Sequence, residues 1–196
     1  MDSVVQNELR RKAAHFSGVL WVLASYYLTV GQTMIVLLIF LFLSIISASS
    51  YRQKIRIPVL NNITDYLYSI ARENEQKLGL HLGAIYFFAS LALVLFITQD
   101  LEIFRIAALV LIVGDGMAGI FGVVYGKTKL PWNPNKTLEG SIAGFIGAAI
   151  AISFILPINY AFLAAFVGIV IETIGWKLND NLTVPLGVGL VLWLLM

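Results

Sequence analysis

The sequence contains no cysteine and only two histidines, His15 and His81, among its 196 residues. The missing thiols exclude disulfides, thiolate catalysis and metal sites built on cysteine. Two histidines are too few for a histidine-rich metal centre. Any chemistry must therefore be sought mainly among carboxylates and basic side chains.

Charge is also scarce. Only 12% of the residues are charged and 59% are hydrophobic, whereas a soluble domain carries roughly a quarter charged residues. The hydrophobic residues fall in blocks long enough to cross a bilayer, which takes roughly 20 residues. Residues 1–12 are polar and no small-residue cleavage motif follows, so we expect no cleavable signal peptide. These features predict an integral membrane protein with a single domain, 1–196.

We predict an all-α, polytopic helix bundle. Its seven transmembrane segments are 14–30, 33–49, 80–98, 104–125, 141–156, 160–176 and 184–196. The last is short and either spans with tilt and local thinning or enters only part-way. Between the second and third segments, apolar residues recur at helical spacing within 57–77. They predict a cytoplasmic-side helix, lying either at the membrane surface or over the inner face of the bundle.

The distribution of lysine and arginine gives an orientation. With a cytoplasmic N-terminus, twelve of the thirteen cations fall at the inner ends of the segments, and only Arg105 falls outside. Such an asymmetry is typical of cytoplasmic loops. We therefore expect a multi-pass protein whose N-terminus and polar site face the cytoplasm.

Asp115 lies near the middle of segment 104–125, between Gly114 and Gly116. Carboxylates within membrane segments are rare and usually face a cavity or a partner. Close helix packing explains the glycines as well as function does, but it does not explain the aspartate. We predict a functional Asp115, with a buried structural hydrogen bond as the alternative.

The stretch "GKTKLPWNPNKTLEG", 126–140, brings basic residues to a predicted helix start. It contains Lys127, Lys129, Lys136, Thr137, Glu139 and Gly140. Backbone N–H groups at a helix N-terminus, with lysines nearby, bind phosphate. Lysines placed only for topology are the alternative. The preceding "GVVYGKT" is not a P-loop, because three residues rather than four separate its glycines.

Two further groups of polar residues fall near the same membrane face. Glu8, Arg11, Lys12 and His15 have the spacing of one helical face, which either anchors the helix or lines a polar cavity. Glu172, Asp180 and Asn181 follow near the end of the chain. Carboxylates with cations suit Mg²⁺ and a polyphosphate, and either phosphoryl or nucleotidyl transfer to a lipid fits such a site.

Four stretches, "RRKAAH", "GDGMAGIFGVVYGK", "NKTLEGSIAG" and "DNLTVPL", resemble the CTP-dependent lipid kinases, a family that includes dolichol or polyprenol kinase, phytol kinase and the yeast-type diacylglycerol kinase. The Lys136-Thr137-x-Glu139-Gly140 element is shared with the related CDP-diacylglycerol synthases. Their C-terminal Ser-Lys-Arg and His-Gly-Gly signatures are replaced here by residues 180–185. The chain is therefore similar to the kinase branch of the family. Because it is shorter than eukaryotic dolichol kinases, it resembles a minimal, prokaryotic catalytic core.

This resemblance implies Mg²⁺-dependent transfer of the γ-phosphate of CTP to a long-chain lipid alcohol. Our own hypothesis is that Asp115 and Asp180 bind the metal, with Glu172 as a further candidate. The hypothesis assigns nucleotide binding to Arg11, Lys12, Lys127, Lys129, Asn135, Lys136, Thr137 and Gly140. Glu139 orders the loop or assists the metal, His15 lines the site, and the general base is left open among Asp115, Glu172 and His15.

Other functions compete with this prediction. A cytidylyltransferase that makes a CDP-lipid is the nearest. An ion or solute transporter would need polar residues through the full bilayer depth, yet the outer halves of the segments are almost entirely apolar. A non-catalytic scaffold leaves the clustered charges unexplained. We expect CTP, a lipid alcohol and the bilayer as partners and no nucleic acid, and we leave open whether the protein is a monomer or a homodimer.

Overall fold

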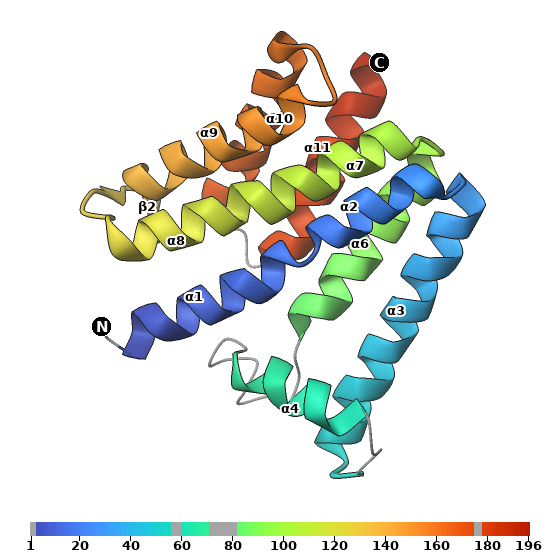
Figure 1. Cartoon of the computed structure of the whole chain (residues 1–196). Coiled ribbons are helices and arrows are strands. Elements are labelled where there is room, and N and C mark those ends of the chain that lie inside the picture. The colour runs from blue at the N-terminus through green and yellow to red at the C-terminus, as the bar shows by residue number, and fades with distance from the viewer. Residues whose placement is uncertain (1–2, 56–59, 71–81, 175–177) are drawn as a thin grey trace.

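The computed structural model describes residues 3–55, 60–70, 82–174 and 178–196. These residues form a helix bundle with one short hairpin (Figure 1), which confirms the predicted helical class. The elements in chain order are α1 (Ser3–Phe16), α2 (Val19–Ala24), η1 (Ser25–Tyr27), α3 (Val30–Arg52), α4 (Leu60–Ser69), α6 (Leu82–Thr98), α7 (Leu101–Leu109), η2 (Val110–Asp115), α8 (Gly116–Val124), β1 (Lys129–Leu130), β2 (Asn133–Thr137), α9 (Leu138–Ser153), α10 (Ile158–Thr173) and α11 (Asp180–Leu195).

The centre of the bundle is one continuous helical rod, Leu101–Val124, formed by α7, η2 and α8. Helices α1, α2, α6, α9, α10 and α11 pack around it (Figure 1). The rod begins where the side chain of Asp100 accepts hydrogen bonds from the backbone N–H groups of Glu102 and Ile103. Phe104, Leu111 and Ile112 are completely buried, so this rod supplies the core against which the other helices are placed.

Segment η2 is a stretch of π-helix in the middle of the rod, and it ends at Asp115. A π-helical turn holds one more residue than the α-helical turns beside it. Such turns occur mostly as single interruptions of α-helices, frequently at functional sites. Asp115 is therefore presented at a local change of helical geometry, which the apolar run in the sequence does not reveal.

The first predicted segment, 14–30, is divided in two. Helix α1 ends at Phe16 and α2 begins at Val19. A Cβ atom on Gly18 would lie 2.9 Å from the side chain of Ile112 and 3.0 Å from the carbonyl oxygen of His15, so a larger residue would have to displace the end of the Ile112 side chain. The chain therefore passes close to the central rod at the junction of α1 and α2.

Helix α4 corresponds to the predicted cytoplasmic-side helix. It packs on the end of α3 through a 2.6 Å hydrogen bond between the hydroxyls of Ser47 and Thr64 and through the rings of Tyr51 and Tyr68, whose centroids are 4.0 Å apart. The parts of the prediction that fall on 56–59 and 71–81 lie outside the described residues. For 60–69, packing against the bundle is confirmed.

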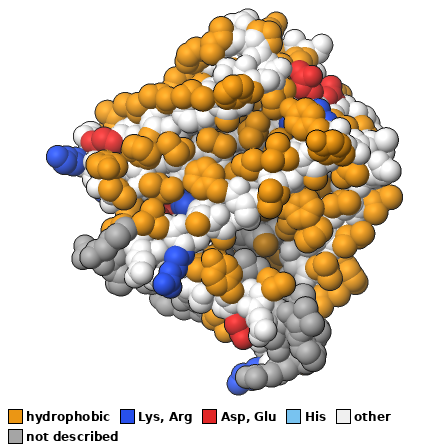
Figure 2. Space-filling view, viewed as in Figure 1, with side chains coloured by type: hydrophobic (Ala, Val, Ile, Leu, Met, Phe, Trp, Pro, Cys, Tyr) orange, Lys and Arg blue, Asp and Glu red, His pale blue; other side chains and the backbone are white. Residues whose placement is uncertain are grey.

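In the part of the chain that the structure describes, two helices, Val30–Arg52 and Leu101–Val124, are long and apolar enough to cross a membrane. Helices α6, α9, α10 and α11 are also apolar but have only 16 or 17 residues. Hydrophobic side chains cover much of the face in Figure 2, and those of α3, α9 and α10 include many that are exposed. An exposed apolar surface of this extent marks a contact with lipid or another apolar partner, so the protein is membrane-associated.

Candidate active site

The site begins with an ion pair between α1 and the central rod. The ammonium nitrogen of Lys12 lies 2.5 Å from Oδ2 of Asp115, and only 4% and 7% of the two side chains is exposed. The pair forms because Gly119, on the same side of α8, leaves room for the lysine. A Cβ atom on Gly119 would overlap Cε of Lys12. The sequence alone does not show which residue pairs with Asp115. In the structure the partner is Lys12, which lies 103 residues earlier in the chain.

His15 lies beside this pair. Its Nε2 atom is 3.1 Å from the carbonyl oxygen of Leu111 and 3.5 Å from Oδ2 of Asp115. Both neighbours accept hydrogen bonds, so we assign the proton to Nε2, which donates to Leu111. Glu8 and Arg11 form an ion pair of 2.6 Å one turn earlier. The predicted polar face of the first helix is confirmed, and it faces α8.

The stretch between α8 and α9, read from the sequence as a loop, is an antiparallel hairpin of β1 and β2. The residue before β1, Thr128, is hydrogen-bonded to the start of α9. Leu138 donates a backbone hydrogen bond of 2.9 Å to Thr128, and the carboxylate of Glu139 accepts from the backbone N–H of Thr128 at 3.1 and 3.2 Å. Backbone N–H groups hold the pKa of Glu139 below its ordinary value. Glu139 thus orders the hairpin.

Helix α9 begins directly at the end of the hairpin. The hydroxyl of Thr137 accepts a 3.2 Å hydrogen bond from the backbone N–H of Gly140, as expected for an N-cap. Gly140 lies against α8, since a Cβ atom there would be 2.6 Å from the carbonyl oxygen of Ala118. The positive end of the α9 dipole therefore faces the same space as the Lys12–Asp115 pair.

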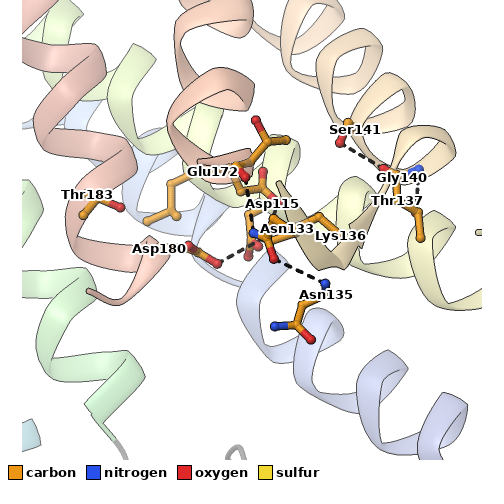
Figure 3. A network of polar contacts seen from close by, with 12 residues as sticks. Asp115, Asn133, Asn135, Lys136, Thr137, Gly140, Ser141, Glu172, Asp180 and Thr183 are labelled. Carbon is orange, nitrogen blue, oxygen red and sulfur yellow. Dashed lines mark hydrogen bonds and ion pairs between the residues drawn. The ribbon is translucent and has the colours of Figure 1, made fainter. Parts of the chain in front are cut away.

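Lys136, on β2, joins the hairpin to the last two helices. Its ammonium lies 2.6 Å from Oε1 of Glu172 on α10 and 3.1 Å from Oδ2 of Asp180 at the start of α11 (Figure 3). Although burial alone would lower the pKa of Lys136, Glu172, Asp115 and Asp180 together raise it above its ordinary value. The amide of Asn133 donates to the carbonyl oxygen of Thr173 at 3.2 Å and holds the hairpin on α10.

These groups surround one polar cavity of about 610 Å³. Ten of the predicted site residues line it: Arg11, Lys12, Asp115, Lys129, Asn135, Lys136, Thr137, Gly140, Glu172 and Asp180. His15, Lys127 and Glu139 are not part of its wall. Among the residues that the structure describes, four acidic and four basic side chains line the cavity: Glu8, Asp115, Glu172 and Asp180, and Arg11, Lys12, Lys129 and Lys136.

The acidic side chains of the cavity are the candidate ligands for the predicted Mg²⁺. Within the described ranges, no group of three or more His, Cys, Asp or Glu side chains is arranged to hold a metal ion. Glu172 and Asp180 nevertheless share one lysine, which puts two carboxylates close together. Mg²⁺ usually takes one or two carboxylates and completes its shell with phosphate oxygens and water. The residues fit a magnesium ion that arrives with a polyphosphate.

Sequence reasoning missed some contributors to the site. Asn133 and Ser141 line the cavity, yet neither stands out in the sequence, because asparagine and serine are ordinary turn and helix-start residues. Lys12 was predicted as a wall residue but not as the partner of Asp115. The only sequence signal for that pairing was the run of glycines on both sides of Asp115, which permits close helix approach.

Comparison with known proteins finds one family model and several relatives that match much of the chain. A sequence model of the cytidylyltransferase family matches residues 6–191. Probable phytol kinase 2, chloroplastic, of Glycine max is 29% identical over 157 residues, which cover 71% of this chain and 54% of the relative. Phytol kinase 1, chloroplastic, of Arabidopsis thaliana is 32% identical over 143 residues, covering 64% and 47%.

An uncharacterized protein of Methanocaldococcus jannaschii is 32% identical over 132 residues, covering 66% of this chain and 65% of the relative. The chain spans about half the length of the two phytol kinases. No solved structure matches it.

Proposed function

The chain belongs to the cytidylyltransferase family, and we propose that it acts there as a CTP-dependent kinase, transferring the γ-phosphate of CTP to the hydroxyl group of a membrane lipid alcohol. The observation that supports this most strongly is the cluster around Lys136. One lysine holds two carboxylates from different helices beside the N-terminus of α9 and across a shared cavity from Asp115. The resemblance to phytol kinases supports the choice of an alcohol acceptor.

In this proposal the triphosphate lies along the hairpin side of the cavity. Lys136, Lys129 and the backbone N–H groups at the start of α9 neutralise its oxygens. Asn135 and Thr137 fix its position, and Arg11 closes the cavity from α1. Lys127 lies outside the cavity wall, so we give it an electrostatic role in attracting the nucleotide rather than a contact.

The balanced charge of the cavity bears on the need for a cation. Four acidic side chains already match the four basic ones, so a triphosphate alone would bring uncompensated negative charge into a partly buried space. We propose that Glu172 and Asp180 hold Mg²⁺, with Asp115 nearest to the transferred group. When bound, the magnesium ion would neutralise charge on the phosphate oxygens.

The chemical step needs a base for the acceptor hydroxyl. Nε2 of His15 already donates to a carbonyl oxygen, and each of the two carboxylates is paired with a lysine, Glu172 with Lys136 and Asp115 with Lys12. We assign the role to Asp115 because it lines both the polar cavity and a second cavity on the other side of its ion pair, whereas Glu172 lines only the polar one. The alcohol oxygen bonds to the γ-phosphorus, the bond from that phosphorus to the β–γ bridging oxygen breaks, and the hydroxyl proton passes to the Asp115 carboxylate. The products are the lipid phosphate and CDP. Lys12 holds Asp115 in place.

A second candidate is cytidylyl transfer to a lipid phosphate, and the description of the matching family favours it. The two reactions differ in which phosphorus is attacked. With CTP labelled at the γ-phosphate, a kinase labels the lipid; with CTP labelled at the α-phosphate, a cytidylyltransferase does. Purified protein should be assayed against polyprenols, phytol, geranylgeraniol and diacylglycerol with CTP or ATP, with and without Mg²⁺. Lipid labelling only from the α-position would contradict the kinase.

We also propose the seven-segment arrangement, with the N-terminus and the polar cavity on the cytoplasmic side of a prokaryotic cell membrane. Helices α9, α10 and α11 are shorter than the roughly 20 residues of a full span, so local thinning of the bilayer would accommodate them. Because the chain has no cysteine, single cysteines can be labelled cleanly. We expect an impermeant reagent to label position 127 only from the cytoplasmic side and position 99 only from the opposite side.

A further inference from the structure

A second cavity lies on the other side of the Lys12–Asp115 pair, with a volume of about 360 Å³. Residues of α1, α2, α3, α4 and α6 line it, and its wall includes the rings of Trp21, Phe40 and Phe88. Trp21 and Phe40 have ring centroids 4.3 Å apart, and those of Phe40 and Phe88 are 5.5 Å apart. Both cavities are lined by Lys12 and Asp115, so the ion pair forms part of the boundary between a charged space and an aromatic one.

The polar side chains on the wall of the aromatic cavity already have partners within the protein. The hydroxyl of Ser17 donates to the carbonyl of Ala14 at 2.6 Å, and that of Ser44 to the carbonyl of Phe40 at 2.7 Å. The amide of Asn181 donates to the carbonyl of Gly83 at 2.9 Å. A ligand in this cavity therefore meets hydrocarbon over most of its length, and charged groups at the Lys12–Asp115 end.

The cavity also reaches the outer surface. Phe40 and Leu43 of α3 and Ile63 of α4 line it, yet these three side chains are 37%, 39% and 56% exposed. Helix α3 is the least covered of the long helices, with only 17% of its apolar window buried. The entrance is thus surrounded by exposed apolar side chains, where the tails of membrane lipids would lie.

We propose that this cavity holds the hydrocarbon chain of the acceptor, a long single-chain primary alcohol that enters from the bilayer past α3 and α4 and places its hydroxyl group against Asp115. The assignment rests on the proposed kinase function and adds the route and class of its acceptor. A single chain with one terminal hydroxyl matches a mostly apolar wall whose charged side chains lie at the Lys12–Asp115 end. A diacylglycerol would bring two ester groups into a space whose hydrogen-bonding groups are already engaged.

Photo-crosslinking tests the location without depending on catalysis. The full chain in lipid nanodiscs is irradiated with a geranylgeraniol analogue that carries a diazirine on its chain, and the labelled peptides are identified by mass spectrometry. We expect label on the peptides that contain Trp21 and residues 40–43, and competition by unlabelled geranylgeraniol. Label confined to α9 and α10 would overturn the assignment. Label in the cavity without transfer from CTP would refute the kinase function alone, whereas transfer without label there would refute the acceptor route alone.

Two matched substitutions test the specificity. Ser44 lines the cavity, whereas Ser49 is exposed on the same helix and does not line it. We expect Ser44→Phe to raise the KM for geranylgeraniol at least 10-fold while the KM for CTP stays within 2-fold, and Ser49→Phe to change neither. Leu43→Trp, at a partly exposed position, serves as a second blocking variant should Ser44→Phe fold poorly. The proposal would be contradicted if Ser44→Phe and Ser49→Phe had the same KM for geranylgeraniol. It would also be contradicted if the wild-type protein phosphorylated dioleoylglycerol as fast as geranylgeraniol.

Discussion

The two ends of the central rod hold their charges in different ways. At the α8 end, Lys12 and Lys136 contact carboxylates of Asp115, Glu172 and Asp180 around a cavity. At the α7 end, Arg105 bonds only to neutral atoms of Ser25, its carbonyl at 2.8 Å and its hydroxyl at 2.9 Å.

The guanidinium of Arg105 also lies 4.0 Å from the ring centroid of Tyr26, and neither cavity described above reaches it. These contacts lie within the protein, so Arg105 fastens η1 to α7. Lys12 and Lys136 instead contact carboxylates on the wall of a cavity, where a metal ion or a phosphate group could replace one partner of each pair. A buried charged side chain is therefore not by itself evidence of a ligand-binding site. A buried charged side chain on the wall of a cavity is stronger evidence.

The largest effect is expected from Asp115→Asn. Loss of the proposed base should lower phosphoryl transfer by about 10²–10⁴-fold, measured as label transferred from γ-labelled CTP. The substitution also leaves Lys12 buried without its carboxylate, at a cost of about 3–5 kcal/mol in the free energy of unfolding. The double variant Lys12→Met, Asp115→Asn removes both charges; we expect it to recover part of that stability and to remain inactive. Turnover at the wild-type rate in either variant would exclude Asp115 as the base.

Lys136→Ala should come next, with transfer reduced by about 10²–10³-fold because a charge that stabilises the phosphate is lost. Arg105→Gln is the matched control at the other end of the rod. It should lower the free energy of unfolding by about 1–3 kcal/mol through its lost hydrogen bonds, with kcat unchanged in the folded fraction. If the arginine variant loses turnover as Lys136→Ala does, the contrast between the two ends fails.

The pH dependence of the Lys136 contacts follows from its raised pKa. A lysine whose folded-state pKa lies above the unfolded value of roughly 10.4 contributes its full stabilisation below that value and loses it only as the pH rises through the folded-state pKa. The loss of stability in Lys136→Ala should thus be the same at pH 6.5 and pH 9 in urea titrations. A difference that shrinks over this range would mean that the ammonium deprotonates earlier.

A smaller effect is expected from Gly119→Ala, because its methyl group would overlap the side chain of Lys12. Overpacking of this kind costs about 1–3 kcal/mol, and the displaced Lys12 should lower kcat by about 10–100-fold. Gly31→Ala is the control, since nothing lies within 4 Å of a Cβ atom there. It should leave kinetics unchanged and the melting temperature equal or slightly higher.

The smallest effect separates two helix caps. Thr137 caps α9 inside the cavity, and Thr29 caps α3 away from it. Replacing either with alanine should lower the free energy of unfolding by about 1 kcal/mol. Only Thr137→Ala should also raise the KM for CTP, by several-fold. An equal change in KM for both variants would show that the cap at Thr137 acts through stability alone.

Composition and periodicity predicted most of the helices, because long apolar runs leave few other structures for the backbone. They also predicted which polar residues lie at one end of the bundle, since positions i, i+3, i+4 and i+7 share a face. Glu8 and Lys12 do lie beside Gly119 of α8, and Lys12 and His15 lie beside Asp115 at the end of η2. These are local properties, and local spacing is sufficient to reveal them.

Features that depend on packing were not predicted. The break at Gly18 comes from its contact with Ile112, which lies 94 positions later. The hairpin is held because Thr128 bonds to Leu138 and Glu139 of α9, and Asn133 bonds to Thr173 of α10. The aromatic cavity joins Trp21, Phe40 and Phe88 from three helices, and aromatic residues in apolar segments carry no signal that they would meet.

The π-helical turn before Asp115 has a consequence for insertions and deletions. Each residue of an α-helix turns its successors by about 100° around the axis, whereas the extra residue of the π-helical turn at 110–115 is taken up within that turn. A residue removed from α7, with the π-helical turn kept, would rotate all of α8 by about 100°. The glycines that admit α1 on one side and α9 on the other would then point elsewhere. The number of residues before α8, more than the identity of the apolar residues in this turn, therefore sets the direction in which the glycines of α8 face.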